Sequence, residues 1–588
     1  MKLGKVSLQN LISDDYISYI VGIHHGFVPN TSIRRDVDET FGGKSWLLER
    51  HNLVNYLSSS LNVQFPKVTS PIQVKLLSGL TTVSDWIASG SLFEDPQKEY
   101  KDIIDIAIDN AGFIKPIIKI NLSFKTIFGF EQNLIQHQFT NIINNPGVYI
   151  LEAPMGIGKT EAALYVAYKM LTTNKAVGIY FALPTQLTSN KIYERMQKFL
   201  NSILLPDSLH KKLILVHANS KLTEMGEDAN PGGEWFNHSK RALLAPFAVG
   251  TIDQALMSVL NVKHSFIRSF GLFGKVVILD EVHTYDSYTG MLLEELINEL
   301  KNLQCTVIIL SATLTHDKRQ TFLNTTVKNN AYPLISMVSN DKNILQEVAL
   351  PFDKEKKVKI EILNNEIEVL NEVLYRASLG QQILWIENTV NDAQLIFAKL
   401  SARSDGLEIG LLHSQYLRQD RTEIEEYWTN IYGKNNYEQR GKKGRVLVGT
   451  QILEQSLDID ADFLVSKIAP VDMLLQRLGR LWRHDNDQRN QTAICEMWII
   501  APELSHAVLH PDKSFQASAK VYSPYVLCRS LEVILTKKQI ILPNDIRDLI
   551  ESTYNNRDES GLLLKMLNEL KCYYSAATQK KSKIFIKL

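Results

Sequence analysis

Cysteine, net charge and long apolar runs are scarce in this 588-residue sequence. The four cysteines (Cys305, Cys495, Cys528 and Cys572) form no CxxC pair, which argues against a disulfide framework or a zinc site and favours a reducing compartment. Lysine plus arginine and aspartate plus glutamate each number 64, so no general basic field attracts nucleic acid or an acidic membrane. No run approaches the ~18–20 apolar residues of a membrane helix, and no signal-peptide core is present. We therefore expect a cytoplasmic protein without membrane contact.

The composition is that of an ordinary globular chain, with 45% hydrophobic and 22% charged residues. At roughly 150 residues per domain, the length predicts about four domains. Two basic runs, 354–359 and 440–445, are expected to be solvated loops, with phosphate contact as the alternative.

The middle of the chain contains two successive sets of continuous apolar runs with amphipathic helical patterns between them. Continuous rather than alternating hydrophobicity is typical of parallel strands that are covered on both faces. The sequence therefore predicts two α/β units, each with a doubly wound sheet. The runs are 148–153, 177–183, 275–280 and 305–310 in the first set, and 381–387, 408–413, 445–450 and 462–468 in the second.

Both ends of the chain have mainly helical patterns, for example at 11–23 and 71–89. The last 80 or so residues carry no pattern that indicates chemistry. The predicted domains are a helical domain at 1–115, α/β domains at 116–345 and 346–505, and a short helical segment at 506–588.

A phosphate-binding loop follows the first predicted strand. Residues 153–160, APMGIGKT, fit the AxxxxGK[ST] variant of the P-loop, in which Gly156 and Gly158 allow backbone N–H groups to point at phosphate oxygens. A helix follows at once and adds the positive end of its dipole. In such a loop Lys159 reaches the β- and γ-phosphates and Thr160 ligates Mg²⁺.

Two carboxylates follow a later apolar strand. Asp280 is the last residue of the run 275–280 and Glu281 follows it, and in a parallel sheet this end of the strand lies beside the P-loop. Asp280 can hold the Mg²⁺ shell while Glu281 orients and deprotonates the attacking water. Together with the P-loop, this pair predicts hydrolysis of a nucleoside triphosphate, and ATP is the expected nucleotide.

Four further motifs resemble those of superfamily 2 helicases, which implies two tandem RecA-like domains around a nucleotide cleft. They are a DExH box at 280–283, an SAT motif at 311–313, motif V at 449–458 and motif VI at 476–483. The resemblance implies that Arg480 and Arg483 stabilise the γ-phosphate, with Gln476 and Asp458 in the same motifs. A structural salt-bridge pair is the alternative for the two arginines.

The same resemblance implies contacts with adenine and with a nucleic-acid strand. Gln136 corresponds to a Q motif, although a glutamine on a helix surface explains it equally well. Hydroxyls and loop amides would contact backbone phosphates without a large net charge. The predicted strand contacts are Pro184, Thr185, Gly250, Thr251, Asn388, Thr389 and Thr450, with His413 and Ser414 nearby.

Longer stretches resemble the Cas3 family, the helicase–nucleases of type I CRISPR systems. The stretches are 241–246, 280–286, 474–484, 521–531 and 542–554, and the resemblance extends over about residues 12–555. It implies ATP-dependent translocation on single-stranded DNA with 3′→5′ polarity. It also implies recruitment to target DNA that is opened by the RNA-guided Cascade complex.

The N-terminal segment departs from the Cas3 pattern. His24-His25 and Asp85 resemble the second half of the metal-binding HD nuclease motifs, whereas no histidine precedes His24. Three ligands are too few to hold a hydrolytic metal such as Mn²⁺, Ni²⁺, Co²⁺ or Fe²⁺ firmly. We therefore expect the nuclease to be absent, or to depend on a separate HD fragment or another Cas3 partner that supplies the missing ligands.

Two other functions remain open at this point. One is a general superfamily 2 DNA or RNA helicase in repair, which the HD-like segment disfavours. The other is a non-catalytic module that binds Cascade, which would have no need of the intact Lys159, Thr160, Asp280, Glu281 and Arg480.

Overall fold

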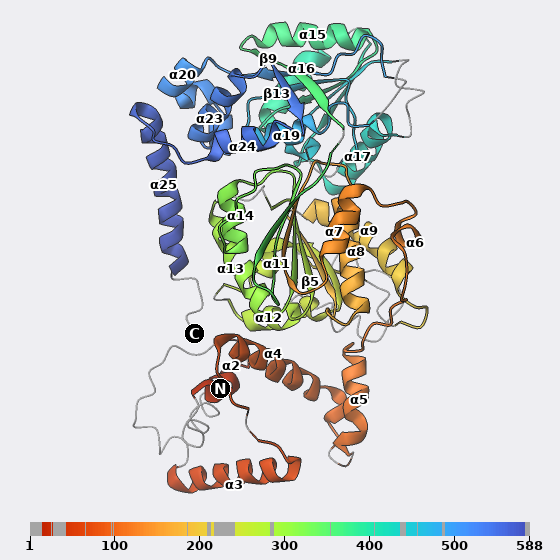
Figure 1. Cartoon of the computed structure of the whole chain (residues 1–588), viewed down its shortest axis with the longest axis vertical. Helices are drawn as coiled ribbons and strands as arrows, with labels where there is room; N and C mark the ends of the chain where they lie inside the picture. Colours follow the sequence, from red (N-terminus) through yellow and green to blue (C-terminus); the bar gives the residue numbers. More distant parts are fainter. Residues whose placement is uncertain are drawn as a thin grey trace.

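The computed structural model places a group of N-terminal helices below two α/β lobes, and the lobes lie one above the other (Figure 1). The structure describes residues 15–24, 26, 43–64, 66–95, 97, 99–184, 186–208, 213–216, 241–260, 262–282, 287–352, 354–404, 406–434, 443–454, 457–484 and 489–582. The predicted α/β class with two tandem doubly wound domains is confirmed.

The first lobe is built on an eight-stranded sheet in the order β3-β4-β2-β5-β6-β1-β7-β8. Its strands are β1 (Gly147–Glu152), β2 (Ile179–Leu183), β3 (Ile214–Val216), β4 (Phe247–Thr251), β5 (Val276–Asp280), β6 (Thr306–Ser311), β7 (Leu334–Ser339) and β8 (Leu345–Ala349). The strands from β3 to β1 are parallel, whereas β7 and β8 are antiparallel to their neighbours. All four strands predicted for this unit are confirmed within a few residues.

Helices cover both faces of this sheet, because each of its central strands is apolar on both sides. They are α6 (Phe124–Phe128), α7 (Leu134–Ile142), α8 (Lys159–Thr172), α9 (Gln186–Ile203), α11 (Ile252–Leu256), α12 (Ser265–Leu272), α13 (Ser287–Asn302) and α14 (His316–Leu323). Residues Glu152 and Ser311 are register partners on β1 and β6, and Asp280 faces Leu310 on β5 and β6. The P-loop, the acidic pair and the SAT motif therefore begin at one edge of the sheet.

The second lobe has a seven-stranded sheet in the order β11-β12-β10-β13-β14-β9-β15, and only β15 is antiparallel to its neighbour. Its strands are β9 (Lys356–Leu363), β10 (Gln382–Ile386), β11 (Glu408–Leu412), β12 (Arg445–Gly449), β13 (Phe463–Lys467), β14 (Glu496–Ile500) and β15 (Gln539–Leu542). Its helices include α15 (Glu366–Ser378), α16 (Val390–Ser401), α17 (Arg418–Tyr432) and α19 (Val471–Leu478).

The first basic run, 354–359, is a solvated loop only in part. Strand β9 begins at Lys356, and the Nζ atom of this half-buried lysine donates to the carbonyls of Leu478 (3.0 Å) and Leu481 (2.7 Å). Lys354, Glu355, Lys357 and Lys359 are exposed. Charge alone does not reveal that carbonyls at the end of α19 and just beyond it accept from a lysine of this run. The second run begins among residues outside the described part and ends in β12 at Arg445.

The N-terminal helices are attached to the first lobe. They are α2 (Asp15–Ile23), α3 (Gly43–Leu61), α4 (Pro71–Ala88) and α5 (Tyr100–Asn110), and α4 packs on α12. A Cβ atom at Gly79 would collide with Phe270, so glycine is needed where these two helices cross. A largely buried ion pair joins Lys75 of α4 to Glu299 of α13. The Arg241 guanidinium lies 4.9 Å from the centre of the Trp86 ring.

The C-terminal segment is mainly helical, as predicted, and packs against the second lobe. It contains α20 (Leu504–Leu509), α21 (Pro511–Phe515), α22 (Ser518–Val521), α23 (Pro524–Leu535), α24 (Ile546–Tyr554) and α25 (Gly561–Ser582). Strand β15 lies within this segment and extends the sheet of the second lobe. Within the described residues, every helix is too short or too polar to cross a bilayer.

A fully buried arginine stabilises the centre of the second lobe. Arg477 on α19 has 0% side-chain exposure, and its ion pair with Glu454 is equally buried at 2.7 Å. Its other N–H groups donate to Ser466 Oγ (2.7 Å), the Lys467 carbonyl (2.9 Å) and Asn388 Oδ1 (2.9 Å). The guanidinium thus joins α19, β13 and the segment after β10.

Arg477→Ala should lower the free energy of unfolding by ~3–5 kcal/mol, because the substitution leaves the Glu454 carboxylate buried without its cation. Urea unfolding followed by tryptophan fluorescence measures the change. The control is Lys399→Ala, which breaks an exposed pair with Glu366 in the same lobe and should cost no more than ~1 kcal/mol. Equal effects of the two substitutions would contradict this account.

Candidate functional site

The P-loop lies between β1 and α8 and is supported from outside by the start of α7. Both Gly156 and Gly158 have positive φ angles, 82° and 79°, which glycine adopts without strain. Gln136 Nε2 donates to the Gly158 carbonyl at 3.0 Å, and Asn133 Nδ2 donates to the Ile157 carbonyl at 2.9 Å. The loop conformation is therefore fixed by side chains of a neighbouring helix.

Gln136 does not lie on the surface of its helix, so that alternative from the sequence is wrong. Only 2% of the residue is exposed, and its side chain forms a capping box with Asn133 at the start of α7. The structure places it against the P-loop at Gly158, and adenine contact remains a prediction.

The P-loop lysine lies half-buried beside the acidic pair. Lys159 Nζ donates to the carbonyls of Ala153 (2.7 Å) and Pro154 (3.1 Å). Burial lowers its pKa, while the nearby charges of Glu281 and Asp280 act in the opposite direction. The ammonium group and the two carboxylates therefore form one charged cluster at the carboxyl edge of the sheet.

The two carboxylates occupy a constrained turn after β5. Burial, and secondarily the charge of Glu281, raises the pKa of Asp280 to about 7. Glu281 has a φ of 55°, uncommon for a residue other than glycine, and its backbone N–H lies within hydrogen-bonding distance of both Asp280 Oδ1 (3.0 Å) and the Leu310 carbonyl (3.1 Å). This strained turn directs the two side chains toward the cleft. His283 of the DExH box lies outside the described residues.

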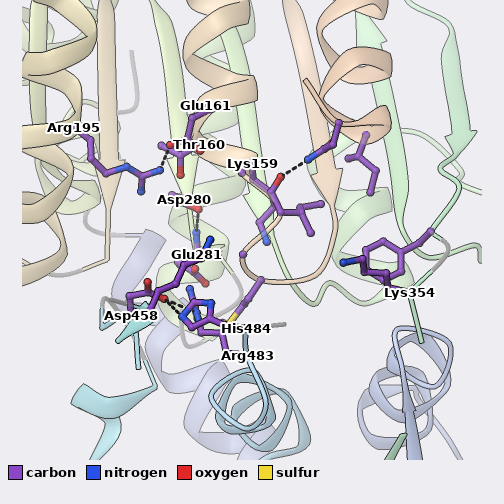
Figure 2. Close-up of a pocket in the computed structure, with 18 of the residues that line it drawn as sticks. Lys159, Thr160, Glu161, Arg195, Asp280, Glu281, Lys354, Asp458, Arg483 and His484 are labelled. Carbon is purple, nitrogen blue, oxygen red and sulfur yellow. Dashed lines mark hydrogen bonds and ion pairs between the residues drawn. The ribbon is translucent and has the colours of Figure 1, made fainter. Parts of the chain in front are cut away.

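The second lobe presents a basic cluster to this acidic pair. Figure 2 shows Asp458, Arg483 and His484 below Glu281, on the side of the cleft opposite Thr160 and Glu161. Asp458 Oδ1 lies 2.8 Å from Arg483 Nε and 3.1 Å from His484 Nε2. The hydrogen bond from His484 and the charge of Arg483 lower the pKa of Asp458 to about 2 although burial opposes them.

Arg480 lies deeper than Arg483 and is held by backbone carbonyls. Its Nη1 donates to the Leu457 carbonyl at 2.6 Å and its Nη2 donates to the Glu454 carbonyl at 2.5 Å. Burial, and then the charge of Arg483, lowers its pKa to about 9. Lys356 fixes the carbonyls on either side of this arginine, at Leu478 and Leu481.

A cleft of about 1460 Å³ between the lobes joins these groups. This volume exceeds the ~300–1,000 Å³ of most small-molecule pockets. Predicted residues that line the cleft are Gly156, Gly158, Lys159, Thr160, Asp280, Glu281, Asp458, Arg480 and Arg483. Gln476 does not line it, because its side chain is buried in α19 with its Nε2 atom 3.9 Å from the Met473 sulfur.

Several residues of the cleft were not predicted from the sequence. Glu161 and Arg195 form an ion pair beside Thr160, and the segment that joins the lobes contributes Pro351, Phe352 and Lys354. Glu161 directly follows the GKT motif and could have been included. Nothing in the sequence around Arg195 indicates proximity to the P-loop, because tertiary folding alone brings it there. Lys354 belongs to the basic run 354–359, for which the sequence leaves phosphate contact open as an alternative.

Asn388, one of the residues predicted to contact a nucleic-acid strand, lies in a buried hydrogen-bond network. Asn388 is 2% exposed, its Nδ2 donates to the Ile468 carbonyl and to Ser518 Oγ, and its Oδ1 accepts from Arg477. Its side chain bonds within the lobe, and contact between this residue and a strand remains a prediction. A lone asparagine after a strand gives no sign of such a buried network.

The other residues predicted to contact a nucleic-acid strand, apart from Thr185, have known positions in the structure, and their contacts with a strand remain predictions. Thr251 ends β4 and Thr450 directly follows β12, and both residues are buried. Thr389 caps α16 by accepting from the Asp392 N–H at 3.2 Å. Gly250 lies in β4 and Pro184 directly follows β2, whereas Thr185 lies outside the described residues.

The structure describes two of the three residues that resemble HD-type ligands. His24 is half-buried at the end of α2, and its Nδ1 is 2.6 Å from the Val21 carbonyl, while Asp85 lies on α4. In the part of the chain that the structure describes, no three histidine, cysteine or acidic side chains are grouped to hold a metal. His25 is outside that part.

The fold and the cleft define a two-lobed P-loop protein of the helicase class. The sequence matches the DEAD/DEAH box helicase family model over residues 133–322. It also matches the models for the C-terminal part of the CRISPR-associated nuclease/helicase Cas3 over 379–486 and for the Cas3 HD domain over 5–93. The chain belongs to the Cas3 family.

Individual relatives support this assignment over most of the chain. The Cas3 nuclease/helicase of Streptococcus thermophilus is 31% identical over 94% of this chain and 65% of its own length, and that of Escherichia coli is 32% identical over 82% and 59%. The chain thus spans about two thirds or less of these curated relatives. The crystal structure of T. fusca Cas3 with ATP has a TM-score of 0.86 at 26% identity, covering 98% of this chain and 72% of that one.

The raised pKa of Asp280 predicts how stability changes with pH. An unfolded aspartate has a pKa of about 3.9, so the tighter proton binding of the folded state contributes stability that is complete below pH 4 and lost as pH rises to about 7. Asp280→Asn, which cannot ionise, should therefore unfold at a higher temperature than the unaltered chain at pH 8 in chelated buffer. The difference should shrink toward pH 5.

Asp458→Asn is the matched control with the opposite sign. The folded-state pKa of Asp458 is lowered, so its ionised form contributes stability at neutral pH, and its loss should lower the unfolding temperature. Thermal unfolding between pH 5 and 8 measures both variants. Two shifts in the same direction at pH 8 would contradict the assigned surroundings.

Proposed function

We propose that the chain is an ATP hydrolase that moves along single-stranded DNA in the 3′→5′ direction. The observation that carries this proposal is the cleft that unites Lys159 and Glu281 of one lobe with Arg480 and Arg483 of the other. A cleft whose walls come from both lobes can close on a nucleotide and open after hydrolysis. Such a cycle converts the chemical step into relative motion of the lobes.

Each side chain has a proposed role that follows from its position. Gly156 and Gly158 cradle the phosphates, Lys159 neutralises them, and Thr160 with Asp280 would hold the Mg²⁺ that accompanies ATP. Glu281, which lines the same cleft as Lys159 and Thr160, accepts a proton from the attacking water.

The arginines of the second lobe would stabilise the charge on the transferred phosphate. Arg483 would contact the phosphate after its ion pair with Asp458 breaks. Arg480 donates to two carbonyls of the motif V segment and so holds that segment beside the phosphate site. Gln476 would act from within α19 by maintaining the turn that carries both arginines.

We propose that the substrate strand and the recruiting partner are those of CRISPR interference. The relatives are named CRISPR-associated nuclease/helicases, and a chain in a structure named as a CRISPR RNA-guided surveillance complex, pre-nicking, has a TM-score of 0.75 at 26% identity. A Cascade complex that opens target DNA is thus the proposed partner. Because the net charge is zero, DNA would be held by backbone amides and local cations rather than by a basic field.

We propose that nuclease activity requires residues that a partner supplies. The HD match and the positions of His24 and Asp85 support descent from a metal nuclease, while the described side chains do not form a metal site. Helix α3 exposes Trp46, Leu53 and Tyr56, an apolar surface against which a further HD fragment could pack.

Lys159→Ala should reduce DNA-stimulated ATP hydrolysis by about a thousandfold, because the phosphates lose their main cation. Phosphate release with and without single-stranded DNA measures the effect. The matched control is Lys169→Ala on the same helix, whose ammonium donates to the Thr140 carbonyl at 2.6 Å away from the cleft, and it should retain nearly full activity. DNA-dependent hydrolysis that persists in Lys159→Ala would contradict the site.

Hydrolysis absent from the unaltered chain would instead support a non-catalytic Cascade-binding module.

The chain alone should cleave single-stranded DNA weakly or not at all in Mn²⁺, Ni²⁺ or Co²⁺, because His24, His25 and Asp85 are the three candidate ligands that match the HD motifs and three are too few to hold a metal firmly. Gel analysis of labelled DNA measures cleavage, with Asp85→Ala as the comparison. Robust metal-dependent cutting that is lost in Asp85→Ala would overturn this expectation.

A further inference from the structure

A buried carboxylate outside the nucleotide cleft is located directly before the P-loop. Glu152 is the last residue of β1, and it is 0% exposed. Its Oε2 lies 3.2 Å from Arg319 Nε, and its Oε1 lies 2.9 Å from Arg547 Nη1. Ionised groups at this depth are retained only when paired, so the two arginines are required to neutralise this position.

The two arginines come from different parts of the molecule. Arg319 lies on α14 of the first lobe and also pairs with Glu347 of β8 at 3.2 Å. Arg547 lies near the start of α24, whose apolar residues Ile546, Leu549 and Ile550 belong to the core of the second lobe. Arg547 therefore crosses from the second lobe into the base of the first.

Arg547 also contacts the segments that follow the SAT motif. Its Nη1 donates to the Leu314 carbonyl at 2.7 Å and its Nη2 donates to the Ala331 carbonyl at 3.3 Å. The guanidinium carbon lies 5.9 Å from the Tyr332 ring centre, and the Tyr332 hydroxyl donates to the Ala312 carbonyl at 2.8 Å. A single side chain thus touches the P-loop strand and the backbone on both sides of α14.

Helix α24 has two further polar contacts along its length. One turn after Arg547, Glu551 Oε1 accepts from the His316 backbone N–H at 2.6 Å, at the start of α14. At the end of the helix, the Tyr554 hydroxyl donates to Asp472 of α19, the helix that leads to Arg480. The same helix therefore connects the SAT side of the first lobe with the arginine-bearing helix of the second.

Glu152 is joined through the next residue, Ala153, to the P-loop lysine. The carbonyl of Ala153 accepts from Lys159 Nζ at 2.7 Å, and its N–H donates to the Ser311 carbonyl at 3.1 Å. A shift of the Glu152 carboxylate would displace this peptide, and with it the position of the lysine. Misplacement of a catalytic group by about 1 Å can cost two orders of magnitude in rate.

We infer that Arg547 is a positioning residue of the nucleotide site, through which helix α24 of the second lobe sets the placement of the P-loop and the SAT segment. This inference rests on the proposed ATP hydrolysis for its effect on rate, whereas its structural part does not. Rotation of the second lobe moves α24, and the buried pair with Glu152 transmits that motion to the strand that carries the P-loop.

Arg547→Lys tests the inference with little risk to folding, because it keeps the positive charge and loses the planar fork that reaches two carbonyls at once. We expect kcat for DNA-stimulated ATP hydrolysis to fall about tenfold while KM for ATP changes less than twofold. The matched control is Arg529→Lys, a similarly buried arginine of α23 whose partners Tyr525, Glu532, Glu559 and the Ser552 carbonyl all lie in the C-terminal segment. This control should keep kcat within twofold.

Amide hydrogen exchange supplies a readout that does not depend on catalysis. Exchange at residues 153–158 and 312–316 should rise in Arg547→Lys and not in Arg529→Lys, relative to the unaltered chain. If Arg547→Lys fails to fold, Glu551→Ala should give a smaller rise confined to 314–318. Unchanged exchange together with unchanged kcat would overturn the inference. If the unaltered chain does not hydrolyse ATP, the proposed function is refuted. The role of Arg547 is then still decided by the exchange pattern.

Discussion

The arrangement of this protein depends on the parallel register of β1, β5 and β6. Parallel strands end at the same edge of a sheet, so the segments that follow them meet even though they are far apart in the sequence. The P-loop, the acidic pair and the SAT motif each begin where one of these strands ends. A shift of one residue in any strand would turn its terminal side chain to the other face and separate these groups.

Buried cations then fix the segments that the register brings together. Lys356 holds the carbonyls around the turn that carries Arg480, and Arg477 joins α19 to Glu454 and Asn388. These side chains donate to acceptors inside the lobe, so the loss of one donor removes a hydrogen bond or leaves a buried charge unpaired. The catalytic side of the cleft is consequently supported by residues that never face it.

The sequence was sufficient for the elements whose signals are local. Continuous apolar runs predicted the buried strands, and helix α8 lies at 159–172 as the pattern indicated. Gly156 and Gly158 have positive φ angles, which favour glycine, so the loop needs glycine at these positions and its motif can be recognised in the sequence. The sequence did not reveal the buried contacts of Asn388 or the strand that begins within the basic run 354–359, because the partners of those side chains come from segments 80 to 130 residues further along.

The sequence by itself determined the helicase class, the Cas3 family and the identity of the residues that line the nucleotide cleft from the P-loop and the later motifs. Those features are encoded by short stretches whose chemistry requires particular residue types at fixed spacing. Only the tertiary structure decided that Arg195 and Lys354 reach the cleft, that Gln136 supports the P-loop, and that Arg547 crosses between the lobes. The physical reason is that burial and charge pairing depend on which distant surfaces meet, and no local pattern of side chains specifies that meeting.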